Sequence, residues 1–138
     1  MVPDAAVPDE VGDLVAAVLR DFPREVAAAW RFARVVPDRG PDADGAAWIC
    51  ISSESDLDGD ARIWLAGDDS ESRQHLLLRL ADQLQDELVE SSAGWGRPLP
   101  PCDLHPHHPL QAGLVDDAAV WCCPATGAAR FPVGASAP

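Results

Sequence analysis

The feature that most constrains the fold of this chain is a single long helix with a leucine face. Within residues 69–92, leucines recur three or four residues apart, which places them on one side of an α-helix: Leu77, Leu80, Leu84 and Leu88. Asp68 and Glu71 have the spacing of a capping box at its start, and Gly94 lies where a helix-ending glycine is expected. We therefore predict a long amphipathic helix over residues 69–92.

Two helices and a β-hairpin are predicted before the long helix. Asp9 is a candidate N-cap for a first helix, whose apolar face is Val11, Leu14, Val15, Val18 and Leu19. A second helix is expected with Pro23 in its first turn and a second apolar set turned inward, namely Val26, Ala29, Trp30 and Ala33. Residues 46–53 and 61–66 show strand-like alternation around a glycine-containing turn, which predicts an antiparallel hairpin.

After the long helix, residues 98–134 are predicted to form a proline-rich turn and a second β-hairpin that reverses at Asp116-Asp117. A length of 138 residues is typical of one domain. We therefore predict a single α+β domain over residues 1–138. Residues 9–97 would form its body of helices and hairpin, and residues 98–134 a zinc-ribbon-like C-terminal hairpin.

The charge of the chain excludes some partners and favours others. The formal net charge is −13, which argues against nucleic acid and against anionic membranes, because both require a basic surface. It is compatible with a partner protein that has a basic surface, or with an acidic surface that only favours solubility. The start of the chain lacks a signal-peptide pattern and no apolar run reaches membrane-spanning length, so we predict a cytoplasmic protein with reduced thiols.

Cysteines and histidines gather in residues 101–127. Cys102 and His105 fall in one proline-flanked turn, and Cys123 opens a second turn about twenty residues later. Two short ligand-bearing turns at the end of a hairpin are typical of zinc ribbons, in which thiolate and imidazole bind the metal. We predict one zinc ion bound by Cys102, His105, His108 and Cys123.

Two points of this prediction stay open. His107 competes with His108 for the fourth ligand position, and Thr126 stands where a full ribbon carries a further thiolate. The alternative to a metal site is a proline-rich loop capped by histidines, beside two thiols that act as small core residues.

The same segment resembles the end of a group of short uncharacterised proteins of high-GC actinobacteria. The resemblance rests on the CxxHxxHPL pattern from Cys102 to Leu110 and on the WxCPxTG pattern from Trp121 to Gly127. It covers roughly residues 70–130 and implies a shared α+β body with a ribbon-like C-terminal hairpin. It implies no activity.

A partner-binding surface is predicted around the first hairpin. Trp48 and Trp64 share one face of its strands, and acidic residues in the flanking loops are expected at the same end: Asp42, Asp44, Asp68 and Asp69. An aromatic patch with an acidic rim suits a protein interface. The alternative is that the N-terminal helices cover the two tryptophans, which would make them part of the core.

Together these patterns predict a small acidic binding or accessory module that is not an enzyme and carries a structural zinc clip. Its partner would be a basic protein, and an inhibitor or immunity-type role fits the charge. The rival prediction is a small zinc-dependent enzyme with an open metal site at Cys102, His105 and Cys123. Four protein ligands would favour the clip, and an open coordination position in a pocket would favour the enzyme.

Overall fold

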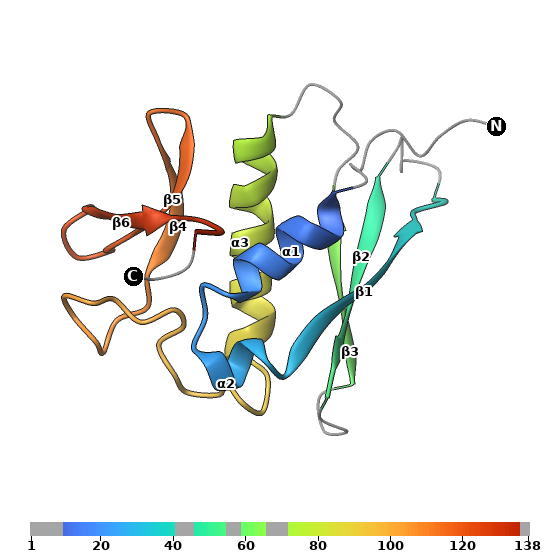
Figure 1. Ribbon diagram of the computed structural model, residues 1–138, viewed down its shortest axis with the longest axis horizontal. Coiled ribbons are helices and arrows are strands. Elements are labelled where there is room, and N and C mark those ends of the chain that lie inside the picture. The colour runs from blue at the N-terminus through green and yellow to red at the C-terminus, as the bar shows by residue number, and fades with distance from the viewer. Residues whose placement is uncertain (1–9, 41–45, 55–58, 66–71, 136–138) are drawn as a thin grey trace.

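The computed structural model describes residues 10–40, 46–54, 59–65 and 72–135. These residues form a mixed α+β structure with three helices and two antiparallel three-stranded sheets (Figure 1). The helices are α1 (Val11–Leu19), α2 (Arg24–Ala27) and α3 (Arg73–Val89). The first sheet contains β1 (Trp30–Pro37), β2 (Ala47–Ser53) and β3 (Asp60–Leu65), and the second contains β4 (Gln111–Val115), β5 (Ala118–Cys122) and β6 (Ala129–Pro132). Figure 1 shows α3 between the two sheets, with α1 lying across it.

Helix α3 is shorter than predicted at both ends. It starts after Ser72, whose hydroxyl accepts a hydrogen bond from the backbone N–H of His75 at 3.2 Å, whereas the predicted capping pair lies outside the described residues. It ends at Val89, and the chain then turns back so closely that a Cβ on Gly94 would lie 1.9 Å from the Leu88 carbonyl oxygen. Six of its residues are buried in the core: Leu76, Leu77, Leu80, Ala81, Leu84 and Leu88.

The second predicted helix is wrong beyond its first turn. Helix α2 has only four residues, and the chain from Trp30 onward is strand β1. This strand pairs antiparallel with β2, with Phe32 opposite Ile51, and Ala33 lies at an irregularity in the register. Aromatic and β-branched side chains suit a strand that can pair with a neighbour. Tertiary pairing therefore overrides the local helical spacing.

The first predicted hairpin is present as β2 and β3, within one or two residues of the predicted bounds. Its inward face is fully buried among α1 and α3, through Ile49, Ile51, Ile63 and Leu65. Because β1 pairs with β2 on the other side, the hairpin is part of a three-stranded sheet.

The second predicted hairpin is also one strand larger than expected. Strands β4 and β5 reverse at Asp116 and Asp117, whose φ angles of 51° and 63° fit a two-residue hairpin turn, and β6 adds a third strand beside β5. On β5, the indole of Trp121 is fully buried and donates its N–H to Asp21 Oδ2 at 2.8 Å. One continuous hydrophobic core therefore joins the N-terminal helices, both sheets and the turn at Cys102.

Candidate metal centre

The first ligand turn, residues 101–109, is closed by backbone hydrogen bonds. The Cys102 N–H donates to the His108 carbonyl at 2.9 Å, and the His108 N–H donates to the His105 carbonyl at 2.8 Å. Pro101 and Pro109 face each other as an isolated β-bridge at its base. The turn therefore holds the side chains of Cys102 and His105 near each other on a fixed backbone.

The second ligand turn follows β5. The Cys123 N–H donates to the Ala128 carbonyl at 2.8 Å, and the Gly127 N–H donates to the Cys123 carbonyl at 2.7 Å. Gly127 has a φ of 75°, a conformation that residues with a Cβ rarely adopt. The glycine of the Cys-Pro-Ala-Thr-Gly stretch is thus what allows the chain to fold back and present the Cys123 thiol.

The two turns bring three potential metal ligands together. His105 Nδ1 lies 3.4 Å from Cys123 Sγ and 4.0 Å from Cys102 Sγ, and all three ligand atoms lie within 4.8 Å of one another. Around a tetrahedral zinc ion, with bonds of about 2.3 Å to sulfur and about 2.1 Å to nitrogen, a sulfur and a nitrogen are about 3.6 Å apart. The two thiols are buried and the imidazole is half-buried. This cluster could hold a metal ion.

The surroundings of Cys123 favour its thiolate form. The pKa of this thiol is lowered to about 6, chiefly by a hydrogen bond from the Thr126 side chain. Burial opposes this shift, whereas the backbone N–H groups of Thr126 and Ala125 and the His105 ring support it. The thiolate is the form of cysteine that binds metals. Thr126, at the position where a full ribbon carries a further thiolate, therefore stabilises the thiolate of a candidate ligand.

The predicted fourth ligand does not join the cluster. The His108 side chain is exposed, and its ring centroid lies 5.9 Å from that of His105. The competing residue, His107, is also exposed and lines a neighbouring pocket. Within the described residues, three of the four predicted ligands converge, and His108 as the fourth stays a prediction.

Sequence reasoning missed a second residue that supports the centre. Arg130 on β6 forms a two-pronged ion pair with Asp103 of the first ligand turn, with 2.7 Å from Nε to Oδ1 and 2.5 Å from an Nη to Oδ2. Asp103 chiefly, and both cluster thiols to a lesser degree, raise the pKa of this guanidinium. Arg130 thus ties β6 to the ligand turn and places a positive charge near the thiols. No local motif around it signals this role.

The four cysteines are free, and they differ in their surroundings. Cys122, next to Cys123 in sequence, lies outside the cluster, half-buried, and burial raises the pKa of its thiol. Cys50 is buried on the first sheet. Cys122 and Cys50 therefore serve as natural controls for Cys102 and Cys123.

The predicted partner surface is only partly described. Asp42, Asp44, Asp68 and Asp69 lie outside the described residues. Trp48 and Trp64 are paired across β2 and β3, outside the buried core, and Trp64 donates its indole N–H to Asp38 at 3.0 Å. Trp48 is half-buried and Trp64 is exposed, because α1 packs on the opposite, isoleucine face of the sheet.

The face of the two tryptophans also carries basic side chains. In the neighbouring row of the register, Arg34 and Arg62 flank Cys50, and both arginines are exposed. The described part of this surface therefore mixes tryptophan with arginine. Whether it binds a partner stays a prediction.

No family model, no curated protein and no solved structure matches this chain. Among the helices of the described residues, none has the length and apolar character needed to cross a membrane.

Proposed function

We propose that the protein is a small acidic binding module, not an enzyme, in which one zinc ion clips the C-terminal segment to the rest of the fold. The ligands would be Cys102, His105 and Cys123, with His108 as the fourth. The observation that carries this proposal is the convergence of three ligand atoms within 4.8 Å, from two separate turns. Two thiolates and one or two imidazoles are a preferred ligand set of zinc.

A structural role fits the position of the cluster. The two ligand turns are more than a dozen residues apart in sequence, and the first is rich in proline. A metal bound across them would join the proline-rich turn to the end of β5, and its binding free energy would add to the stability of the fold.

The carboxyl group of the first ligand turn is not a ready catalytic base. Asp103, the acid of the first ligand turn, is held by Arg130, whose hydrogen bond is the main cause of a lowered pKa for this carboxyl. A general base works best with a pKa near the operating pH. Asp103 therefore acts as one half of an ion pair rather than as a proton acceptor.

The partner we propose is a protein with a basic surface. The net charge of −13 supports this proposal, because it attracts cationic surfaces and repels nucleic acid and anionic membranes. An inhibitor or immunity-type role would use such complementarity.

A zinc-dependent enzyme is the second candidate, favoured by one observation: three ligands converge and His108 lies exposed. Three protein ligands with an exchangeable fourth position are typical of catalytic zinc. Cobalt substitution separates the two functions. If His108 completes the clip, added azide should leave the spectrum of the cobalt-substituted protein unchanged. The spectrum should change in His108→Ala but not in His107→Ala. A spectrum that responds to azide in the unaltered protein would favour the enzyme.

Metal analysis of the untagged protein tests the clip itself. We expect one zinc per chain, loss of that zinc in Cys123→Ser, and retention in Cys122→Ser, because only Cys123 belongs to the cluster. A zinc content near zero, with β4–β6 still ordered, would instead support a proline-stiffened loop beside two buried thiols.

A further inference from the structure

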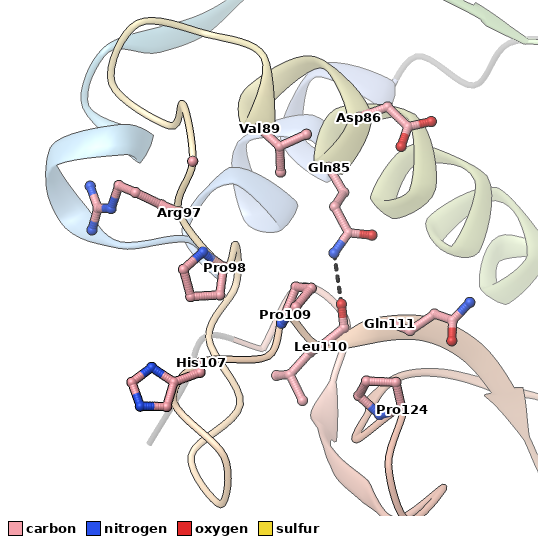
Figure 2. Close-up of a pocket in the computed structure, with 11 residues that line it drawn as sticks. Gln85, Asp86, Val89, Arg97, Pro98, His107, Pro109, Leu110, Gln111 and Pro124 are labelled. Carbon is pink, nitrogen blue, oxygen red and sulfur yellow. Dashed lines mark hydrogen bonds between the residues drawn. The ribbon is translucent and has the colours of Figure 1, made fainter.

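A pocket of about 510 Å³ lies beside the metal centre. Figure 2 shows it between the C-terminal half of α3, the chain around Pro98, and the loop that leads into β4. Its apolar lining residues are Val89, Pro98, Pro109, Leu110 and Pro124. Its volume falls within the range of ligand pockets, and its lining mixes these apolar residues with polar and charged side chains.

Gln85 fixes the floor of this pocket. Its amide Nε2 donates to the Leu99 carbonyl at 2.8 Å and to the Leu110 carbonyl at 2.7 Å. Figure 2 shows the second of these bonds. Both amide hydrogens are used in this way, which leaves the side-chain oxygen as an acceptor. Gln85 therefore holds the chain around Leu99 and the loop before β4 against α3 on this side of the pocket.

The rim of the pocket is negatively charged. Asp86 belongs to its lining, Asp82 lies one turn earlier on the same side of α3, and Glu90 directly follows the helix. No basic residue lies in the last turn of this helix, although its C-terminal end favours positive charge. Burial, followed by the charge of Asp86, raises the pKa of Asp82.

The one arginine of the lining does not offset this charge. Arg97 pairs with Glu25 at 2.5 Å, and Figure 2 shows its side chain turned toward α2. A cationic group of a partner would therefore meet carboxylates along α3 whose charge Arg97 does not neutralise.

An exposed tryptophan lies next to the pocket lining in the chain. Trp95 is 74% exposed and directly precedes Gly96 of the pocket lining. An indole in this position can contact both an apolar side chain and a cation.

We propose that this pocket is the docking site for the basic partner, and that it takes an apolar side chain from a partner segment that carries arginine or lysine on either side. This inference rests on the proposed function and names its binding site. The acids from Asp82 to Glu90 extend along about 12 Å of helix axis, at about 1.5 Å per residue. They lie largely outside the hollow, so a peptide segment can reach both the pocket and the acids, whereas a small molecule in the pocket cannot.

Docking should also depend on the metal. Pro124 follows the ligand Cys123, and His107 lies in the same turn as His105, so both ligand turns contribute to the pocket lining. Metal bound at the cluster would fix this wall against α3. Loss of the metal would loosen the wall and weaken docking without altering the helix.

Fluorescence anisotropy with synthetic peptides tests the proposal on the zinc-loaded full chain. The probe is a labelled eight-residue peptide with a central leucine and two arginines on each side; control peptides replace the leucine with glycine or the arginines with glutamate. We expect the glycine and glutamate peptides to bind at least about tenfold more weakly than the probe, and the zinc-stripped protein to bind the probe about tenfold more weakly.

Two matched charge reversals locate the site. Asp86→Lys should weaken binding of the probe about tenfold, whereas Asp60→Lys, an exposed change on β3 with the same effect on net charge, should weaken it less than about twofold. Unfolding temperature and zinc content of both variants check that the fold is intact.

Several outcomes would overturn the proposal. The affinity of the arginine peptides could prove independent of the central leucine and of Asp86→Lys. The proposal of a basic partner would then stand, but the pocket would not be its binding site. If the probe fails to bind at about 1 mM, a weak limit for a specific contact, the docking site is refuted, while metal analysis still judges the clip. Equal binding by N-acetyl-leucinamide would make the pocket a small-molecule site.

Discussion

At the scale of single residues, a buried carboxylate joins distant parts of the chain. Asp21, at the end of α1, is only 4% exposed and accepts hydrogen bonds from the Trp121 indole at 2.8 Å and from the Gly134 backbone N–H at 2.6 Å. A buried carboxylate is tolerated in a core when it accepts hydrogen bonds, and both of these bonds go to Oδ2. It connects the N-terminal helices to the second sheet.

We expect Asp21→Ala to lower the free energy of unfolding by about 2–3 kcal/mol, because it leaves the buried indole N–H of Trp121 without an acceptor. Asp21→Asn, which keeps one acceptor oxygen, should cost less. Urea unfolding followed by circular dichroism measures both, with the exposed Asp13→Ala as control. Equal stability of Asp21→Ala and the unaltered protein would contradict a structural role for this carboxylate.

Gly94 illustrates a second constraint at the residue scale, a close approach of backbone to backbone. A methyl group there would collide with the Leu88 carbonyl and with a methyl of Leu99 2.7 Å away. We expect Gly94→Ala to cost about 2 kcal/mol or more, as overpacked sites typically do.

Gly113→Ala is the matched control for Gly94→Ala, because its nearest neighbour atom would be the Cys122 sulfur at 3.8 Å, an ordinary contact. Thermal unfolding of both variants compares them. Similar midpoints would mean that the turn after α3 relaxes freely.

At the scale of elements, α3 uses glutamines to hold the parts of the fold around it. Gln83 bonds both backbone groups of Trp64 at the edge of β3, Gln74 accepts from the Ala119 N–H of β5, and Gln85 holds the loop before β4. Side-chain amides thus pair backbone groups that the sheets leave open. The helix positions the sheets through these bonds as well as through its leucines.

The acids of α3 predict a pH effect on stability. The pKa of Glu87 is raised by burial and by Glu90 and Asp86, so ionisation of this carboxyl opposes folding. Its contribution to stability is therefore full at low pH and is lost as pH rises through the folded-state pKa. Glu87→Gln should raise the free energy of unfolding at pH 7 by roughly 0.2–0.5 kcal/mol, the size of one like-charge helix pair.

This gain should shrink as the pH falls below the ordinary pKa of glutamate, which chemical unfolding at pH 7 and at low pH can measure. Glu54→Gln removes one half of the exposed ion pair with Arg31, so it should bring no gain. A gain from Glu87→Gln that stays constant with pH would argue against the charge as its cause.

At the scale of the whole molecule, the proposed clip predicts that the local stability of one part of the chain depends on the metal more than that of the other part. Chelation should speed hydrogen exchange in the first ligand turn and in β4–β6, because they lose a cross-link, and should leave α1 and β2 nearly unchanged. Lowering the pH through the histidine range should act in the same way, since the ligands must lose their protons to bind. Exchange mass spectrometry compares the two parts.

Cys50→Ser, on the other sheet, is a control that should keep the metal. If α1 and β2 exchange faster to the same extent as β4–β6 after chelation, the metal holds the whole core and not only the C-terminal segment.

Local patterns in the sequence were sufficient where structure depends on near neighbours. The apolar face of α1, the hairpin of β2 and β3, and the Asp116-Asp117 turn all follow from spacing or turn chemistry within about ten residues. The same holds for the pairing of Cys102 with His105 in one turn.

Only the tertiary structure decided the features that join distant residues. The residues around Trp30 have helical spacing but form strand β1, because β1 pairs with β2. Asp21 accepts a hydrogen bond from Trp121, which lies 100 residues away in the sequence. The pocket between α3 and the ligand turns depends likewise on how separate elements pack. Such contacts leave no periodic signal in the sequence. Burial of apolar side chains brings residues together whatever their separation along the chain, so local spacing does not encode these contacts.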